Sequence, residues 1–275
     1  MRKFKISSLL IYLALAIGAV FMFFPFYWMI SSAFKSSIEI VSIPPVFLPS
    51  NWLNFENFIT AFDKAPFATY FFNSILVAFV CVLVTGFTTI LAAFAFSRLE
   101  FKGREYIFSF LLSFMMIPFE MIAMTNFTTM SQWHLNNTLV ALIIPFMTSI
   151  FYTYILRNFF KSVPDSLYYS ARIDGASNWQ YLWKIMVPIA RPSLYTIILL
   201  NALASWNSFF WPNIIITSAK NRTLPFGLYA FMSEGGTAYG PYMAAASIVV
   251  IPMLILFLFA RKYIVNGVAR GGIKG

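Results

Sequence analysis

Few residues in this chain could take part in covalent or metal chemistry. Cys81 is the only cysteine and His134 the only histidine among 275 residues. A single cysteine excludes an internal disulfide and fits a buried thiol, while a lone histidine in a short loop has no second ligand for a metal. The sequence contains no Ser/His/Asp grouping and no G-x-x-x-x-G-K-[ST] phosphate loop. It therefore predicts no catalytic residue, no bound cofactor and no ATP hydrolysis on this chain.

One acidic residue lies inside a long apolar run. Glu120 follows Pro118 by two residues, and a proline inside a helix removes an N–H donor and kinks the helix. Polar groups in an apolar medium are costly, which makes them functional candidates. Glu120 either bonds a polar ligand in a central cavity, or shapes that cavity, or it is protonated or paired with a neighbouring helix.

A second polar group lies in a later apolar run. Asn201, Ser205 and Ser208 recur at helical spacing, with Trp206 and Asn207 beside them. Polar atoms next to an aromatic ring suit a sugar, which offers hydroxyl groups and an apolar face. Packing between helices through small polar residues explains the same pattern. The substrate-path candidates are Glu120, Asn201, Ser205, Trp206 and Asn207.

Composition indicates a membrane protein. Apolar residues make up 60% of the chain and charged residues 10%, whereas soluble domains average roughly half and a quarter. Runs of about 20 apolar residues mark membrane spans. The sequence predicts an all-α polytopic protein, one domain over 1–275, with spans at 9–34, 70–96, 106–130, 138–159, 193–217 and 242–263.

The distribution of basic residues predicts the orientation. Lys and Arg stay preferentially on the cytoplasmic side, and 15 of the 19 lie in the two termini and in the second and fourth loops. Both termini are therefore expected in the cytoplasm. The first apolar run follows a basic start but continues well past Ala14-Leu15-Ala16, which favours an uncleaved span. The net charge of +10 then lies beside anionic lipid and calls for no nucleic acid.

The segment with the most local structural signals is residues 163–193, between the fourth and fifth runs, which we call the hairpin. Pro164 suits a first helical position and starts a short helix. The pair Asp174-Gly175 ends this helix near Ile173, because glycine readily adopts a left-handed conformation.

The hairpin then begins a second helix. Ser177 and Gln180 have the spacing of a capping box, and Ala176 and Tyr181 can pack across it. The second helix is expected to end before Pro188, since the residue preceding a proline disfavours helical geometry. The segment is a predicted helix-turn-helix between the fourth and fifth spans.

Within the hairpin, "SARIDGAS" and "VPIARP" resemble the cytoplasmic loop of binding-protein-dependent ABC importer permeases. The similarity is to the carbohydrate-uptake branch, and within it to the smaller, six-helix permease of maltose-type transporters. That loop reads E-A-A-x-x-D-G-A, and Tyr169, Ser170 and Ala171 stand where Glu, Ala and Ala are expected. Further segments resemble family signatures in family order: "PFYWMISSAFK" from Pro25, "WNSFFWP" from Trp206, "TLPFGL" from Thr223 and the terminal "GGIKG".

The resemblance implies a permease subunit that imports a sugar or oligosaccharide by alternating access. It implies a prokaryotic plasma-membrane complex with a second, different permease chain, an extracellular solute-binding protein and an ATPase dimer that carries ATP and Mg. The loop of about 160–192 would couple this chain to the ATPase through Leu167, Tyr169, Ser170, Ala171, Ile173, Asp174, Gly175 and Ala176. Because Tyr replaces the family Glu, we expect docking to rely on an apolar face formed by Leu167, Ala171 and Ile173.

Two other classes fit less well. A secondary transporter favours repeated halves, broken helices and several buried ionisable groups, but only Glu120 is an acidic residue within a run. A membrane enzyme would need a nucleophile-base pair or a metal cluster. The interiors of the runs also lack basic residues, which argues against a phosphorylated solute.

The predicted orientation can be tested with single cysteines introduced into a Cys81→Ser background. Positions within 50–64 should react with an impermeant thiol reagent in intact cells, and positions within 174–180 only after permeabilisation. The reverse labelling pattern would overturn the orientation.

Overall fold

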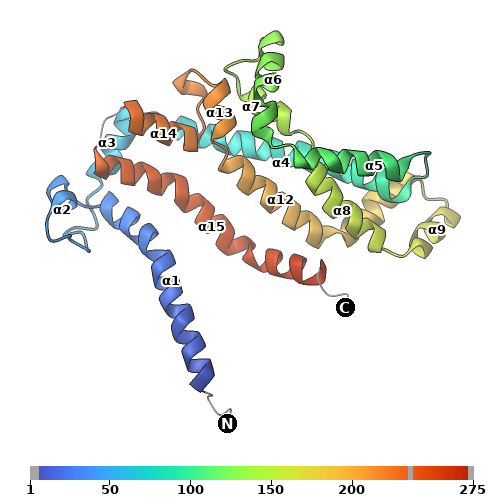
Figure 1. Ribbon diagram of the computed structural model, residues 1–275, viewed down its shortest axis with the longest axis horizontal. Coiled ribbons are helices and arrows are strands. Elements are labelled where there is room, and N and C mark those ends of the chain that lie inside the picture. Colours follow the sequence, from blue (N-terminus) through green and yellow to red (C-terminus); the bar gives the residue numbers. More distant parts are fainter. Residues whose placement is uncertain (1–5, 235–237, 272–275) are drawn as a thin grey trace. The chain divides into compact units, whose positions relative to one another are not determined.

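All regular elements in the part of the chain that the structure describes are helical (Figure 1). The computed structural model describes residues 6–234 and 238–271, so the basic residues at 2–5 and the last four residues of the "GGIKG" signature lie outside it. The chain divides into two compact units, Met1–Ala68 with Gly227–Pro252, and Thr69–Phe226 with Met253–Gly275. The predicted all-α class is confirmed.

Two polar side chains on short helices, the carboxylate of Glu39 and the amide of Asn57, order the first unit. Glu39 accepts hydrogen bonds from the backbone N–H groups of Ser36 and Ser50, both at 2.8 Å, and these bonds lower the pKa of Glu39 to about 2. Asn57 donates to the carbonyls of Ala33 and Lys35 at 3.0 and 2.8 Å. The helices of this unit are α1 (Ile6–Ala33), α2 (Ser37–Val41), α3 (Glu56–Lys64), most of α14 (Leu224–Glu234) and the first part of α15 (Tyr239–Gly271).

The second unit contains the hairpin and the polar candidates of the fifth run. Its elements, many of them short, are α4 (Phe67–Arg98), α5 (Arg104–Ser113), η1 (Phe114–Met116), α6 (Phe119–Gln132), α7 (Leu139–Ile143), η2 (Ile144–Phe146), α8 (Ile150–Ser162), α9 (Asp165–Ile173), α10 (Asn178–Tyr181), the π turn η3 (Leu182–Met186), α11 (Val187–Ile189), α12 (Arg191–Trp206), α13 (Phe210–Ile215) and η4 (Ala219–Asn221).

Two described helices are long and apolar enough to cross a membrane by themselves, one over Leu10–Ala33 and one over Phe67–Arg98. Three bent pairs also qualify if each pair counts as one span, which gives up to five. A shorter apolar stretch, Tyr239–Ile255, lies in α15. The count of six spans therefore stays a prediction. The bent pairs are Arg104–Met116 with Phe119–Gln132 at 98°, Leu139–Phe146 with Ile150–Ser162 at 44°, and Asn178–Ile189 with Arg191–Ile215 at 80°.

The third apolar run shows why such breaks occur. Pro118 was expected to kink a helix, and the structure instead has a complete break there. Ile117 is extended, as a residue before proline prefers, and Pro118 caps α6. Glu120 therefore lies in the first turn of α6, where the helix dipole favours a carboxylate.

One face of α4 is buried along most of its length. Residues spaced by four share a helix face, and this face carries small and polar side chains rather than only large apolar ones. The buried series is Asn73, Val77, Cys81, Thr85, Thr89, Ala93 and Ser97.

Two polar members of this face, Thr85 and Asn73, bond to backbone carbonyls of other segments. The Thr85 hydroxyl donates to the carbonyl of Phe146 at 2.6 Å, where η2 ends before α8 begins. The Asn73 amide donates to the carbonyls of Lys220 and Arg222, both at 2.9 Å. Because no water is available in a bilayer core to satisfy such groups, the Thr85 bond stabilises the break before α8.

Trp211 and Asn137 hold α13 in place. The Trp211 side chain is buried and its indole N–H donates to the carbonyl of Ala141 in α7 at 2.9 Å. Asn137, in a left-handed conformation with φ 59°, accepts at Oδ1 from the N–H groups of Thr217 and Ser218. Both contacts fix the chain beyond the end of α12.

The role of α4 predicts a cost for removing one hydroxyl. Thr85→Val keeps the shape of the side chain but leaves the Phe146 carbonyl without its donor, which should cost about 1–3 kcal/mol. We expect a lower midpoint of thermal unfolding for the purified protein. The matched control is Thr196→Val, whose hydroxyl bonds only within α12, to Pro192 at 3.1 Å. Equal midpoints for the two variants would contradict this role.

Candidate functional site: the hairpin and a polar cavity

The first helix of the hairpin ends as the sequence predicted. Helix α9 runs from Asp165 to Ile173. Pro164 was expected at the first helical position, and it is instead the N-cap, so the helix begins one residue later than expected. Gly175 follows with φ 80°. Two hydrogen bonds close a Schellman motif, from the N–H of Ala176 to the carbonyl of Ala171 at 2.9 Å and from the N–H of Gly175 to that of Arg172 at 3.1 Å. These bonds fix the direction of the turn.

The second leg confirms the capping box and corrects the predicted helix end. The Gln180 N–H donates to the Ser177 hydroxyl at 3.2 Å, and the Ser177 N–H donates to the Gln180 side chain at 2.8 Å. The expectation that the helix ends before Pro188 is wrong, because helical structure continues through α11 to Ile189. The π turn η3 precedes α11. The N–H of Val187, which follows η3, donates to the carbonyl of Leu182, five residues back. This wider turn accommodates the proline, which has no N–H to offer.

Both legs of the hairpin pack on transmembrane candidates of the same unit. Tyr181, Leu182 and Met186 are buried in one apolar cluster with Phe94 of α4 and Phe160 of α8. The hydroxyl of Tyr181 has no hydrogen-bond partner among the described residues, and burial raises its pKa. Across the turn, the Tyr168 hydroxyl donates to the Asn178 side chain at 2.8 Å. The hairpin is therefore braced against α4 and α8.

The predicted docking residues do not share one face. Leu167, Tyr169 and Ile173 are exposed, with Ile173 at 86%. Ala171 is buried in the apolar cluster instead. It lies two residues from both Tyr169 and Ile173, and helical residues two apart point about 200° away from each other around the axis. Within this chain Ala171 supports the hairpin from inside, and the apolar docking surface is left to Leu167 and Ile173.

Other expected coupling residues lie at the turn. Ser170 and Asp174 are exposed and Ala176 is half-buried. Tyr169 lines a polar recess of about 560 Å³ together with Arg98, Arg104 and Asp165. The position that holds Glu in the similar loops therefore shares a recess with two arginines of this chain.

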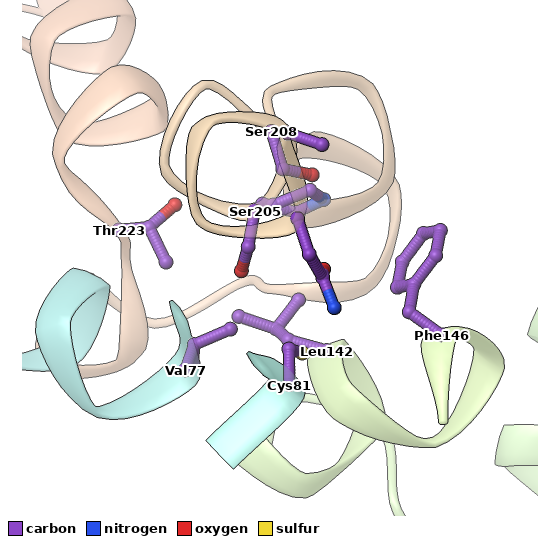
Figure 2. Close-up of a pocket in the computed structure, with 10 residues that line it drawn as sticks. Val77, Cys81, Leu142, Phe146, Ser205, Ser208 and Thr223 are labelled. Atoms are coloured by element: carbon purple, nitrogen blue, oxygen red, sulfur yellow. The ribbon is translucent and has the colours of Figure 1, made fainter. Parts of the chain in front are cut away.

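The fifth run contributes to a small cavity in the same unit. The cavity volume is about 90 Å³. Figure 2 shows Ser205 and Ser208 on one side of the cavity, facing Val77 and Leu142. Asn201 also lines it. Asn201 and Ser205 of α12 line it together, as their helical spacing predicted, and Ser208 lines it from beyond the end of α12.

Thr223 is a cavity residue that the sequence analysis did not single out. Its hydroxyl and the Asn201 Nδ2 are buried and have no hydrogen-bond partner among the described residues. Two unsatisfied polar atoms in one cavity indicate a place for water or a polar ligand group. The available sequence signal was the "TLPFGL" segment, in which Thr223 is the first residue.

The other substrate-path candidates lie away from this cavity. Glu120 is exposed at the start of α6. Trp206 is buried and packs edge-on against Phe71, with ring centroids 5.9 Å apart. Asn207 is exposed at the end of α12. The structure therefore brings together two of the five candidates, Asn201 and Ser205.

The size of the cavity limits what it can hold. Pockets for small ligands usually measure about 300–1,000 Å³, whereas this cavity offers about 90 Å³. It can take water or one polar substituent, but not a whole sugar ring. Among the described residues, no cluster of His, Cys, Asp or Glu could hold a metal ion.

Comparisons with known proteins cover nearly the whole chain. It is 34% identical over 280 residues to the arabinooligosaccharides transport system permease protein AraQ of Halalkalibacterium halodurans, covering 99% of this chain and 100% of AraQ. It is 33% identical over 280 residues to the trehalose/maltose transport system permease protein MalG of Thermococcus litoralis, covering 100% of both.

A solved structure shows the same fold. The chain resembles a subunit of a bacterial ABC transporter involved in import of the acidic polysaccharide alginate, with a TM-score of 0.85, 24% identity, and coverage of 96% of this chain and 98% of that one. A family model for the inner membrane component of binding-protein-dependent transport systems matches residues 86–270. The chain belongs to this family of membrane permease components of binding-protein-dependent transport systems.

Proposed function

We propose that this chain is the permease subunit of an ATP-driven importer for a sugar or oligosaccharide. The observation that carries the proposal is the hairpin, which has a fixed turn and an exposed outer face and is braced on α4 and α8. Support for the substrate class comes from the relatives, whose names specify arabinooligosaccharides and trehalose or maltose. The fold it shares with the alginate transporter subunit is consistent with this class.

The hairpin is proposed to couple this subunit to a separate ATPase dimer. The exposed side chains of Leu167, Tyr169 and Ile173 would rest in a groove of the ATPase, which binds ATP and Mg. Closure of the ATPase would then move the hairpin, and the helices braced on it would change access to the transport path. A second permease chain would complete the path, and an extracellular solute-binding protein would deliver the substrate.

The proposed topology places the complex in the plasma membrane of a prokaryote, with six spans and both termini in the cytoplasm. This orientation puts the hairpin on the side where ATP is available. It also puts the loop that includes Thr223 and the "TLPFGL" segment toward the solute-binding protein.

The small cavity is proposed as this chain's share of the substrate path. Asn201→Ala should lower sugar uptake several-fold per assembled complex, because it removes the amide that lines the cavity. The matched control is Asn207→Ala, the same substitution at an exposed site six residues along the chain, which should transport normally. Uptake and the amount of assembled complex are measured together. Loss of assembly by Asn201→Ala would support the helix-packing interpretation instead.

The coupling role of the hairpin can be tested at Gly175. A Cβ built at this position has no heavy atom within 4 Å, so a substitution acts through the backbone and not through a clash. Val disfavours the positive φ by about 1–3 kcal/mol, and Asn tolerates it. We expect Gly175→Val to abolish both uptake and substrate-stimulated ATP hydrolysis by the reconstituted complex, and Gly175→Asn to retain them. Wild-type uptake and stimulation by Gly175→Val would rule out the hairpin as the coupling element.

A further inference from the structure

One arginine joins the start of the hairpin to α4 and α8 by hydrogen bonds, beside the apolar cluster. Arg98 is the last residue of α4, and only 4% of its side chain is exposed. Its guanidinium donates to the carbonyl of Phe160 at 2.7 Å, to the carbonyl of Val163 and to the carboxylate of Asp165. The sequence analysis counted Arg98 only toward the orientation of the chain.

These three partners belong to different parts of the chain. Phe160 lies in the last turn of α8, Val163 is the C-cap of that helix, and Asp165 is the first residue of α9. The last carbonyls of a helix have no partner within the helix, and the planar guanidinium offers several N–H groups in a fixed fork. Arg98 thereby holds α4, α8 and the start of the hairpin at one point.

The carbonyl bonds carry more of this contact than the ion pair does. The Asp165 side chain is 76% exposed, so water screens its charge and weakens the pair. The bonds from Arg98 to Phe160 and Val163 are buried, and loss of the donor would leave those carbonyls unsatisfied.

Helix α4 offers an unbroken route from this joint to the cavity. It runs without interruption over 32 residues to Arg98, and Val77 and Cys81 on it line the cavity. The other route, through the second leg of the hairpin into α12, passes an 80° bend after Ile189. A displacement at Arg98 therefore reaches the cavity through one continuous helix.

We propose that Arg98 is a positioning residue for coupling, which transmits movement of the hairpin to α4 and α8 together. The proposal rests on the proposed coupling function of the hairpin. It assigns the transmission to hydrogen bonds from one guanidinium, and not to the apolar cluster between the hairpin and α4 alone.

A neighbouring arginine provides the matched control. Arg157 is similarly buried, donates to the carbonyl of Phe96 at 3.0 Å and to Glu105 at 2.6 Å, and lies over the ring of Phe108. These contacts join α8 to α5 and to the end of α4, and none of them involves the hairpin.

The experiment measures sugar uptake per ATP hydrolysed by the complete complex in proteoliposomes, normalised to assembled complex. Arg98→Met keeps most of the apolar stem and removes the fork, and should lower this ratio at least about tenfold, as expected for loss of charge-assisted hydrogen bonds. Arg98→Lys, which restores a charged donor, should recover part of the ratio. Arg157→Met should leave the ratio at the wild-type value even if less complex assembles.

Two results would overturn the proposal: a wild-type ratio for Arg98→Met, or an equal loss of ratio for Arg157→Met. If Arg98→Met does not assemble, Arg98→Lys decides, because a wild-type ratio for that variant would show that the fork is not needed. The Gly175→Val experiment separates the two hypotheses. If Gly175→Val uncouples the complex and Arg98→Met does not, the hairpin is still the coupling element and only the role of Arg98 fails.

Discussion

The need to satisfy backbone hydrogen bonds away from water underlies the second unit of this protein. Its helices are short and interrupted, and each interruption leaves N–H and carbonyl groups that a bilayer core cannot solvate. Helix α4 meets this need with Thr85, which bonds the backbone at the break before α8, and Asn73 on the same face bonds the loop that holds η4. Arg98 does the same at the end of α8. One long, partly polar helix thereby supports several broken ones.

This arrangement links the architecture to the proposed mechanism. The face of α4 that stabilises the breaks also lines the cavity through Val77 and Cys81 and ends at the joint with the hairpin. A helix that bonds to several other segments can also shift them together. Broken helices offer the bends that a change of access requires, and a continuous helix offers the stiffness to drive it.

The chain is a multi-pass membrane permease component and a transport subunit, not an enzyme. Its sequence lacks a phosphate loop, which agrees with ATP hydrolysis on a partner. The cavity of about 90 Å³ is too small for a sugar ring, so the substrate site is proposed to form mainly where this chain meets a second permease. The main contribution that we propose for this chain is therefore the hairpin and the helices that hold it.

The sequence determined the features that depend on local chemistry. Apolar runs gave the helical membrane class, Gly175 gave the end of α9, Ser177 and Gln180 gave the capping box, and helical spacing placed Asn201 and Ser205 on one face. Only the tertiary structure decided the features that depend on partners distant in the chain: the burial of Ala171, the joint at Arg98 and the place of Thr223 in the cavity. A turn or cap is specified within a few residues of chain, whereas the Arg98–Phe160 bond joins positions 62 residues apart, and nothing local to either residue indicates the other.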